Sequence, residues 1–209
     1  MNMSEQGMAT WLGAGFLDFV SRVTVGIAGA GGLGSNCAMH LVRSGFRRFL
    51  VADFDRVEPS NLNRQCFFAD QVGQLKVEAL AENLRRVNPD VVVDARPVRV
   101  EAADAADLFA GCDAVVEAFD DPACKKALVE AVVPSGRLVV AASGIGGCGN
   151  SDAVRIRRML PNFHLVGDME TECSVDHPPL SPTVGVVAAK QADVVLHHFF
   201  ERYKQGETA

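Results

Sequence analysis

A glycine-rich turn between an apolar segment and a helical segment constrains this chain more than any other feature. Apolar residues 23–28 lead directly into Gly29-Ala30-Gly31-Gly32-Leu33-Gly34, after which a helical pattern continues to about residue 43. Glycines in the pattern G-x-G-x-x-G let the backbone approach a phosphate closely, and the helix N-terminus offers unpaired N–H groups. The order of strand, turn and helix therefore predicts a phosphate-binding turn formed by Gly29, Gly31, Gly32 and Gly34.

The rest of the chain repeats this alternation of short apolar runs and helical segments. Residues 48–52, 91–93, 114–118 and 138–142 are predicted strands with helical patterns between them, which is typical of βαβ units. Residues 153–157 and 163–166 add two short strands before a last helix at 181–203. The predicted fold is α/β: a Rossmann-like, mostly parallel twisted sheet with helices on both faces and a short antiparallel C-terminal extension. We expect an N-terminal helical arm at residues 1–22 and one domain at 23–209.

Charge and cysteine spacing argue against several classes of protein. The net charge is −6 and the largest basic cluster is Arg155, Arg157 and Arg158, so no nucleic acid partner is expected. The N-terminus lacks the basic start of a secretory signal, and charged residues interrupt the long apolar C-terminal segment, which predicts a cytoplasmic protein without a membrane partner. None of the six cysteines forms a C-x-x-C pair, so no zinc site is expected.

An acidic residue ends the second predicted strand. Asp53 stands where a carboxylate can accept hydrogen bonds from ribose hydroxyl groups, so the turn and this strand end together predict a nucleotide site. The alternative is that the glycines serve only the close packing of a helix. These features do not choose between NAD and ATP.

Four motifs in order resemble those of the E1-like activating family, which includes the ThiF, MoeB and HesA proteins and the ubiquitin-activating enzymes. The short ThiF-like sulfur carrier protein adenylyltransferases of thiamine biosynthesis are the most similar members. The resemblance is close over residues 23–120 and weak beyond them. The motifs are Gly29-Ala30-Gly31-Gly32-Leu33-Gly34-Ser35, Asp53-Phe54-Asp55, Pro59-Ser60-Asn61-Leu62-Asn63-Arg64-Gln65 and Gly73-Gln74-Leu75-Lys76.

The resemblance implies an ATP-binding adenylation domain and a role for each matching residue. Arg64 would bind the β- and γ-phosphates, Lys76 would stabilise charge at the α-phosphate, and Asp120 would hold Mg²⁺. These three are the expected catalytic residues. The expected ATP-binding residues are Gly29, Gly31, Gly32, Gly34, Asp53, Asp55, Asn61, Arg64, Gln65 and Lys76.

The residues themselves agree with this chemistry. Adenylation requires a held triphosphate and neutralisation of its charge, which two cations near the turn, Arg64 and Lys76, would supply. Each role has an alternative. The two cations could be solvated surface charges, Asp120 could cap the following helix, and Asp55 could only support the long loop at residues 54–72.

The chain departs from the family at three places. It lacks the zinc-binding C-x-x-C pairs of larger relatives, and no arginine precedes Arg22 to serve as the N-terminal arm arginine of many relatives. A reactive cysteine is not clearly placed. Cys173 is the candidate thiol, although neighbouring Glu172 and Asp176 would raise rather than lower its pKa.

The leading functional hypothesis is adenylation of the C-terminal Gly-Gly carboxylate of a ubiquitin-like, ThiS-like sulfur carrier, with release of pyrophosphate, by a homodimer. The second is a nucleotide-binding partner module without turnover, which the missing arm arginine favours. The third is an NAD-dependent oxidoreductase, which would explain residues 29–53 and nothing after them.

Overall fold

A computed structural model describes residues 1–208 and places one seven-stranded sheet at the centre of the chain. The strand order is β3-β2-β1-β4-β5-β7-β6. The strands are β1 (Thr24–Ala28), β2 (Arg48–Ala52), β3 (Val92–Arg96), β4 (Ala114–Glu117), β5 (Leu138–Ala142), β6 (Arg155–Leu160) and β7 (Phe163–Gly167). The α-helices are α1 (Met3–Leu12), α2 (Ala14–Val20), α3 (Gly32–Arg43), α4 (Lys76–Val87), α5 (Ala105–Leu108), α6 (Pro122–Val132) and α7 (Ser181–Lys204).

The sheet is parallel except at one edge. All strand pairs from β3 to β7 are parallel, and β6 pairs antiparallel with β7 from Arg155↔Gly167 to Leu160↔Phe163. The predicted α/β fold with a mostly parallel sheet and an antiparallel C-terminal extension is confirmed. The extension differs in one detail, because β7 itself joins β5 in parallel and only β6 reverses direction.

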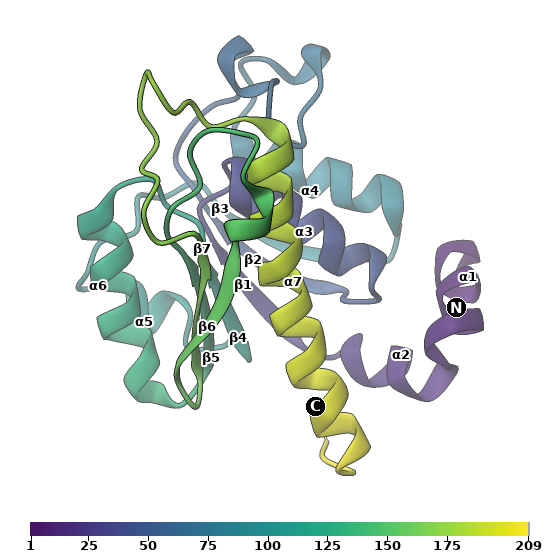
Figure 1. Cartoon of the computed structure of the whole chain (residues 1–209). Coiled ribbons are helices and arrows are strands. Elements are labelled where there is room, and N and C mark those ends of the chain that lie inside the picture. The colour runs from purple at the N-terminus through teal and green to yellow at the C-terminus, as the bar shows by residue number, and fades with distance from the viewer. Residues whose placement is uncertain (209) are drawn as a thin grey trace.

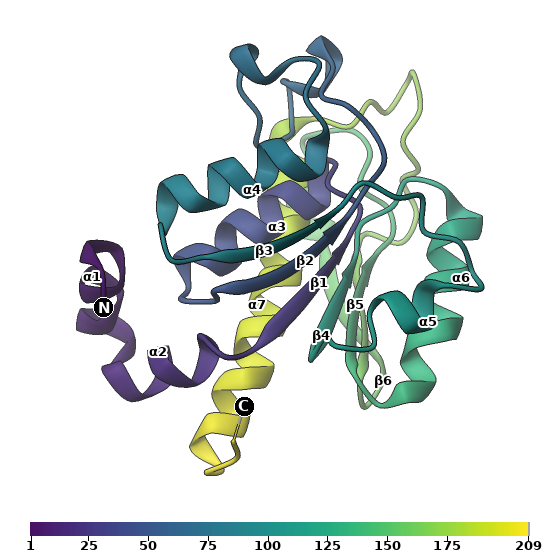
Figure 2. The same cartoon turned by 180° about the vertical axis from the view of Figure 1, so that it is seen from behind.

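Helices cover both faces of the sheet, which explains why its central strands are almost entirely apolar. Figures 1 and 2 show α3, α4 and α7 against one face and α5 and α6 against the other. The central strands β1, β4 and β5 are buried along nearly their whole length. Helix α7 is the longest, and it packs against α3, β5 and β7.

Two short helices, α1 and α2, form the segment before β1. Asn2 caps α1 in a capping box with Glu5, whose buried carboxylate also lies 3.3 Å from Nη1 of Arg47. The Phe16 ring on α2 packs against the rings of Phe200 and Tyr203 near the end of α7. The helical character expected for residues 1–22 is observed, while the division into an arm and a domain at residue 22 stays a prediction.

The loops that follow the parallel strands gather at one edge of the sheet. The longest runs from the end of β2 to α4 and contains two short 3-10 helices, η1 (Pro59–Asn61) and η2 (Ala69–Gln71). This loop and the segment before α7 stand at the same end of the molecule in both views, whereas the chain termini lie at the opposite end (Figures 1 and 2). Ligands of open α/β sheets bind at the carboxyl edge of the strands, so this edge is the expected position of a nucleotide site.

Among residues 1–208, no helix is both long enough and apolar enough to cross a membrane.

Candidate active site

The glycine turn is packed so closely that side chains are excluded at two of its positions. Gly29 has φ +98°, and a Cβ on it would lie 2.8 Å from the carbonyl oxygen of Ala118 at the end of β4. A Cβ on Gly34 would lie 1.8 Å from the carbonyl oxygen of Gly29. The predicted strand, turn and helix are all present, with Gly31 as the N-cap of α3. Close packing against Gly29 therefore accounts for Gly34, whereas the nearest atom to a Cβ on Gly31 is 3.8 Å away.

Asp53 is bound to the glycine turn itself. Its Oδ2 accepts a hydrogen bond of 2.7 Å from the backbone N–H of Ala30, and its Oδ1 accepts one of 2.8 Å from the N–H of Asp55. The two bonds hold the carboxylate of this half-buried residue in one orientation beside the turn. Each oxygen retains acceptor capacity, so the carboxylate can still receive hydroxyl hydrogen bonds.

Lys76 connects to the same group through Asp55. The ammonium Nζ lies 2.7 Å from Oδ2 of Asp55, and the lysine side chain is 9% exposed against 48% for the aspartate. The backbone N–H of Lys76 also donates to the carbonyl of Asp55 at 2.9 Å. The lysine is thus not a solvated surface charge. Asp55 supports the position of Lys76, and its direct contact with a nucleotide stays a prediction.

Arg64 lies over the glycine turn. The Cγ and Cδ atoms of its side chain lie 3.6 and 3.7 Å from the position of a Cβ on Gly32. Its Nη1 donates to the carbonyl of Ser60 at 3.2 Å and to Oδ1 of Asn63 at 2.8 Å. Asn36 on α3 donates to the carbonyl of Arg64 at 2.8 Å, which ties this loop segment to the helix. Arg64 therefore contacts the glycine turn, and Lys76 is connected to it through Asp55 and Asp53.

Gln65 and Asn61 lie in the same loop but differ in their bonding. Gln65 is buried, and its Oε1 has no hydrogen-bond partner among the described residues. Its Nε2 lies 3.8 Å from the position of a Cβ on Gly31, so the amide faces the turn. Asn61 is also buried, but its Oδ1 accepts from the N–H of Glu58 and closes η1. The geometry supports a ligand contact for Gln65 and a structural role for Asn61.

Asp120 follows β4 at the carboxyl edge of the sheet and is exposed. The neighbouring Asp121, not Asp120, caps α6, since its Oδ1 accepts from the N–H of Cys124 at 2.9 Å. Capping, the alternative role considered for Asp120, is therefore wrong. Within residues 1–208 no three His, Cys, Asp or Glu side chains are grouped to hold a metal ion. A single carboxylate still fits Mg²⁺, because this ion binds through one or two carboxylates together with substrate phosphates.

Cys173 lies within electrostatic reach of this site. Partial burial raises the pKa of its thiol, the nearby charge of Asp120 adds to the rise, and Arg64 and Lys125 oppose it. The expected direction is confirmed, but its attribution to Glu172 and Asp176 is wrong. A thiol with a raised pKa is a poor nucleophile at neutral pH. Its participation in the reaction stays a prediction.

One ion pair beside the site was missed by sequence reasoning. Glu117 at the end of β4 is fully buried, and Nζ of Lys125 on α6 lies 3.0 and 2.9 Å from its two carboxylate oxygens. Burial raises the pKa of Glu117, and the lysine ammonium partly opposes this. A glutamate inside the apolar run 114–118 was the available signal, because a buried carboxylate requires a partner.

Two cavities lie at opposite edges of the sheet. The first, of about 460 Å³, is at the carboxyl edge between the segments 146–154 and 168–180. Thr183 lines it, and the next residue, Val184, places Cγ1 2.9 Å from the position of a Cβ on Gly32, so the start of α7 contacts the glycine turn.

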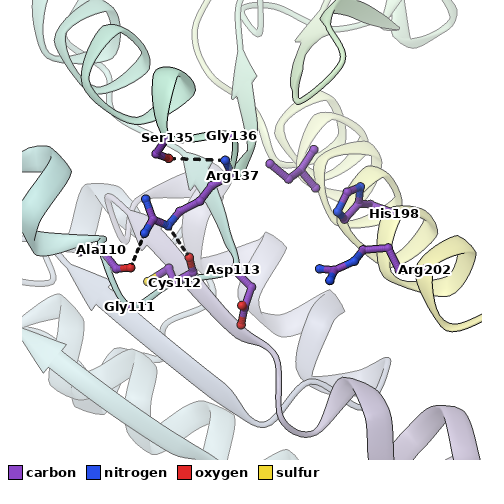
Figure 3. A pocket seen from close by; sticks show the side chains of 10 residues that line it. Ala110, Gly111, Cys112, Asp113, Ser135, Gly136, Arg137, His198 and Arg202 are labelled. Atoms are coloured by element: carbon purple, nitrogen blue, oxygen red, sulfur yellow. Dashed lines mark hydrogen bonds between the residues drawn. The ribbon is translucent and has the colours of Figure 1, made fainter. Parts of the chain in front are cut away.

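The second cavity, of about 410 Å³, lies at the amino ends of β4 and β5 (Figure 3). There Arg137 donates to the carbonyls of Ala110 and Cys112, and His198 and Arg202 project from α7. Because the glycine turn is at the carboxyl ends of the strands, this second cavity is not the predicted nucleotide site.

Comparison with known proteins decides the family. The profile described as the ThiF family matches residues 3–208, which is nearly the whole chain. The chain belongs to the ThiF family. The resemblance to the E1-like activating enzymes is thereby confirmed.

Curated relatives of this ThiF-family chain include proteins named adenylyltransferase and sulfurtransferase UBA4. The chain is 32% identical to the protein of Candida glabrata over 178 residues, covering 85% of this chain and 39% of the relative. It is 36% identical to that of Yarrowia lipolytica over 192 residues, covering 86% of this chain and 46% of the relative. The ThiF-family chain thus spans less than half the length of these relatives.

Solved structures share the fold of this ThiF-family chain at low sequence identity. Escherichia coli tRNA N6-threonylcarbamoyladenosine dehydratase, TcdA, solved with AMP, has a TM-score of 0.86 at 21% identity, with 96% of this chain and 95% of TcdA covered. E. coli MccB, solved with AMPCPP and MccA, has a TM-score of 0.71 at 21% identity, with 90% of this chain and 59% of MccB covered. These matches confirm the Rossmann-like α/β architecture.

Proposed function

We propose that this chain adenylates the C-terminal Gly-Gly carboxylate of a ubiquitin-like sulfur carrier protein with ATP and releases pyrophosphate. The observation that carries the proposal is the connection of two cations to one glycine turn. Arg64 lies over Gly32, and Lys76 is linked to the turn through Asp55 and Asp53. A dinucleotide oxidoreductase would need neither cation, because hydride transfer expels no pyrophosphate.

In the proposed reaction, a carboxylate oxygen of the carrier attacks the α-phosphorus of ATP. The bond between the α-phosphorus and the oxygen that bridges it to the β-phosphate then breaks, and pyrophosphate leaves. Asp53 would hold the ribose, and Gly31, Gly32 and the amide of Gln65 would line the phosphates. Arg64 would bind the leaving pyrophosphate, and Lys76 would stabilise charge at the α-phosphate. Mg²⁺, held by Asp120, would neutralise phosphate charge when bound.

The cavity at the carboxyl edge of the sheet supports a narrow protein tail as the second substrate. Its walls come from the glycine-rich segment 146–150 and the loop before α7, and Thr183 closes it by donating to the carbonyl of Gly147 at 2.9 Å. A tail that ends in two glycines carries no side chains at its last residues, so it fits such a passage.

The names of the relatives and the nucleotides bound in the similar structures support this activity. The UBA4 proteins are called adenylyltransferases, TcdA was solved with AMP and with ATP, and MccB was solved with AMPCPP and MccA. Carrier identity, a place in thiamine biosynthesis and a cytoplasmic location belong to the proposal. A homodimer belongs to the proposal too, because Trp11 and Met3 on α1 are 89% and 88% exposed and offer apolar surface. Light scattering of the purified chain tests it.

Pyrophosphate exchange into ATP in the presence of a Gly-Gly-ending carrier tests the proposal. Lys76→Met and Arg64→Met should each reduce the exchange rate by at least about tenfold, which corresponds to roughly 1.4 kcal/mol of transition-state stabilisation. Lys126→Met is the matched control, because the side chain of Lys126 is 75% exposed on α6. Exchange at the wild-type rate in Lys76→Met would exclude the proposed role of this lysine.

The second candidate is a nucleotide-binding module without turnover. The absence of any arginine before Arg22 favours it, since an arm arginine of the kind found in relatives is missing. Thermal stabilisation by ATP without pyrophosphate exchange would support this candidate, whereas stabilisation by NAD alone would support the oxidoreductase.

A further inference from the structure

The ion pair of Glu117 and Lys125 links three elements at the carboxyl edge of the sheet. Besides both oxygens of Glu117, the ammonium of Lys125 donates to the carbonyl of Ala142 at the end of β5, at 3.2 Å. Gln191 on α7 donates to the carbonyl of Glu117 at 3.0 Å and to that of Val140 at 3.3 Å. The end of β4 is therefore joined to β5, α6 and α7 by the side chains of Lys125 and Gln191.

The turn from β4 to α6 is held at both of its ends. At the first end, the N–H of Phe119 donates to Oε1 of Glu117 at 2.7 Å. At the second, Asp121 caps α6 by accepting from the N–H of Cys124. Asp120, the proposed Mg²⁺ ligand, lies between these two anchors. Its position depends on where Glu117 is kept, because Glu117 holds the backbone N–H of Phe119, the residue before it.

Lys125 is what keeps Glu117 in this place. A fully buried carboxylate is unfavourable without a partner, and Lys125 supplies both a charge and two hydrogen bonds. The next residue on the same helix is a lysine that lacks this burial and these bonds. Lys126 is 75% exposed, and its only close acid is Glu130 at 3.8 Å among the described residues.

Burial raises the pKa of the Cys173 thiol, and the charge of Lys125 opposes this rise. The lysine side chain is 25% exposed, and its head group is directed inward to Glu117 rather than outward.

We propose that Lys125 is a positioning residue that, through its buried bonds to Glu117 and Ala142, fixes the β4–α6 turn and so sets where Asp120 meets the metal ion. This inference rests on the proposed function in one respect, namely that Asp120 binds Mg²⁺. Removing the lysine leaves the glycine turn, Arg64 and Lys76 unchanged, so the affinity for the metal should fall while the KM for ATP does not.

The experiment compares five variants of the full chain: Lys125→Met, Lys125→Arg, Glu117→Gln, the double variant Glu117→Gln/Lys125→Met, and Lys126→Met as the matched control. Backbone amide exchange over residues 118–124 reports on the turn without any need for turnover. The Mg²⁺ concentration that half-saturates pyrophosphate exchange, the KM for ATP and the thermal midpoint complete the set. The double variant leaves no unpaired buried charge, so it separates loss of positioning from simple failure to fold.

In the double variant we expect amide exchange at residues 118–121 to accelerate by at least about tenfold. The half-saturating Mg²⁺ concentration should rise by at least about tenfold, as when a group that orients a metal ligand is lost. The KM for ATP should stay within about twofold of wild type, and Lys125→Arg should recover most of the metal affinity. Lys126→Met should match wild type in every measurement.

Wild-type amide exchange in the double variant, or a wild-type Mg²⁺ requirement in it, would overturn the inference. Failure of the proposed function is distinguishable, because it would abolish pyrophosphate exchange in the wild-type chain while leaving the difference in amide exchange between wild type and the double variant intact.

Discussion

Replacing Gly34 by alanine tests the close contact between the glycine turn and α3. The added Cβ would lie 1.8 Å from the carbonyl oxygen of Gly29 and 3.0 Å from Cγ2 of Ile27, and real Cβ atoms essentially never come closer than 3.0 Å to another heavy atom. The carbonyl is backbone, so the clash cannot be relieved by a rotamer change. The turn and the first residues of the helix must separate by about 1 Å.

The expected loss of stability follows from two opposing contributions. Overpacking costs about 1–3 kcal/mol, and the better helix propensity of alanine offsets about 0.5–1 kcal/mol of it. Because the clash at 1.8 Å is with backbone, the cost lies at the upper end of its range. The net loss is then about 2–2.5 kcal/mol, which lowers the thermal midpoint of a domain of this size by about 4–10 °C. Gly185→Ala is the matched control, because Gly185 also lies in a helix and a Cβ there meets nothing within 4 Å. That variant should gain up to about 1 kcal/mol.

Thermal denaturation of the two variants with and without ATP and Mg²⁺ measures both effects. Gly34→Ala should melt below wild type and lose the stabilisation by nucleotide, because the displaced turn no longer matches the phosphates. Gly185→Ala should melt slightly above wild type and keep that stabilisation. If Gly34→Ala were as stable as Gly185→Ala, the close approach of turn and helix described above would be refuted.

Two further outcomes follow from charges elsewhere in the chain. In a Cys148→Ser background, alkylation of Cys173 should keep rising above pH 9.0, the usual thiol value, because burial and then Asp120 raise its pKa and leave less thiolate at a given pH. Asp120→Asn should accelerate alkylation at neutral pH, and an unchanged rate would contradict the assigned cause. Glu5→Ala should lower the free energy of unfolding by about 1–2 kcal/mol, because it strands Arg47 and removes a buried acceptor. It should also speed proteolysis within residues 1–22. Unchanged melting and digestion would exclude a stabilising role for the Glu5–Arg47 ion pair.

The parallel core of the fold was predictable because its strands are buried on both faces. Continuous apolar runs such as 138–142 identify such strands without any alternation, and the glycine turn sets the first βαβ unit. The edge strand β6 was harder to bound. All six of its residues, Arg155 to Leu160, are exposed, so no burial pattern marks where it begins or ends.

The glycine turn, Asp53, Arg64 and Lys76 were found because they lie in motifs that are local in sequence. The network around Glu117 was not, because Lys125, Ala142 and Gln191 come from three separate elements and meet only when the sheet has formed. Asp120 and Asp121 show a further limit. Either acid could precede a helix that starts at Pro122, and only the backbone angles decide which one is the cap.

The long loop after β2 begins and ends at the same place. Arg56 pairs with Leu75 as an antiparallel bridge, and the N–H of Lys76 donates to the carbonyl of Asp55. Backbone hydrogen bonds therefore hold the two ends of the loop together. Residues could be added or removed between these ends without moving either the sheet or the start of α4. Descendants of one ancestral enzyme could therefore trade one protein partner for another by remodelling this single excursion, while the lysine at its base kept its place.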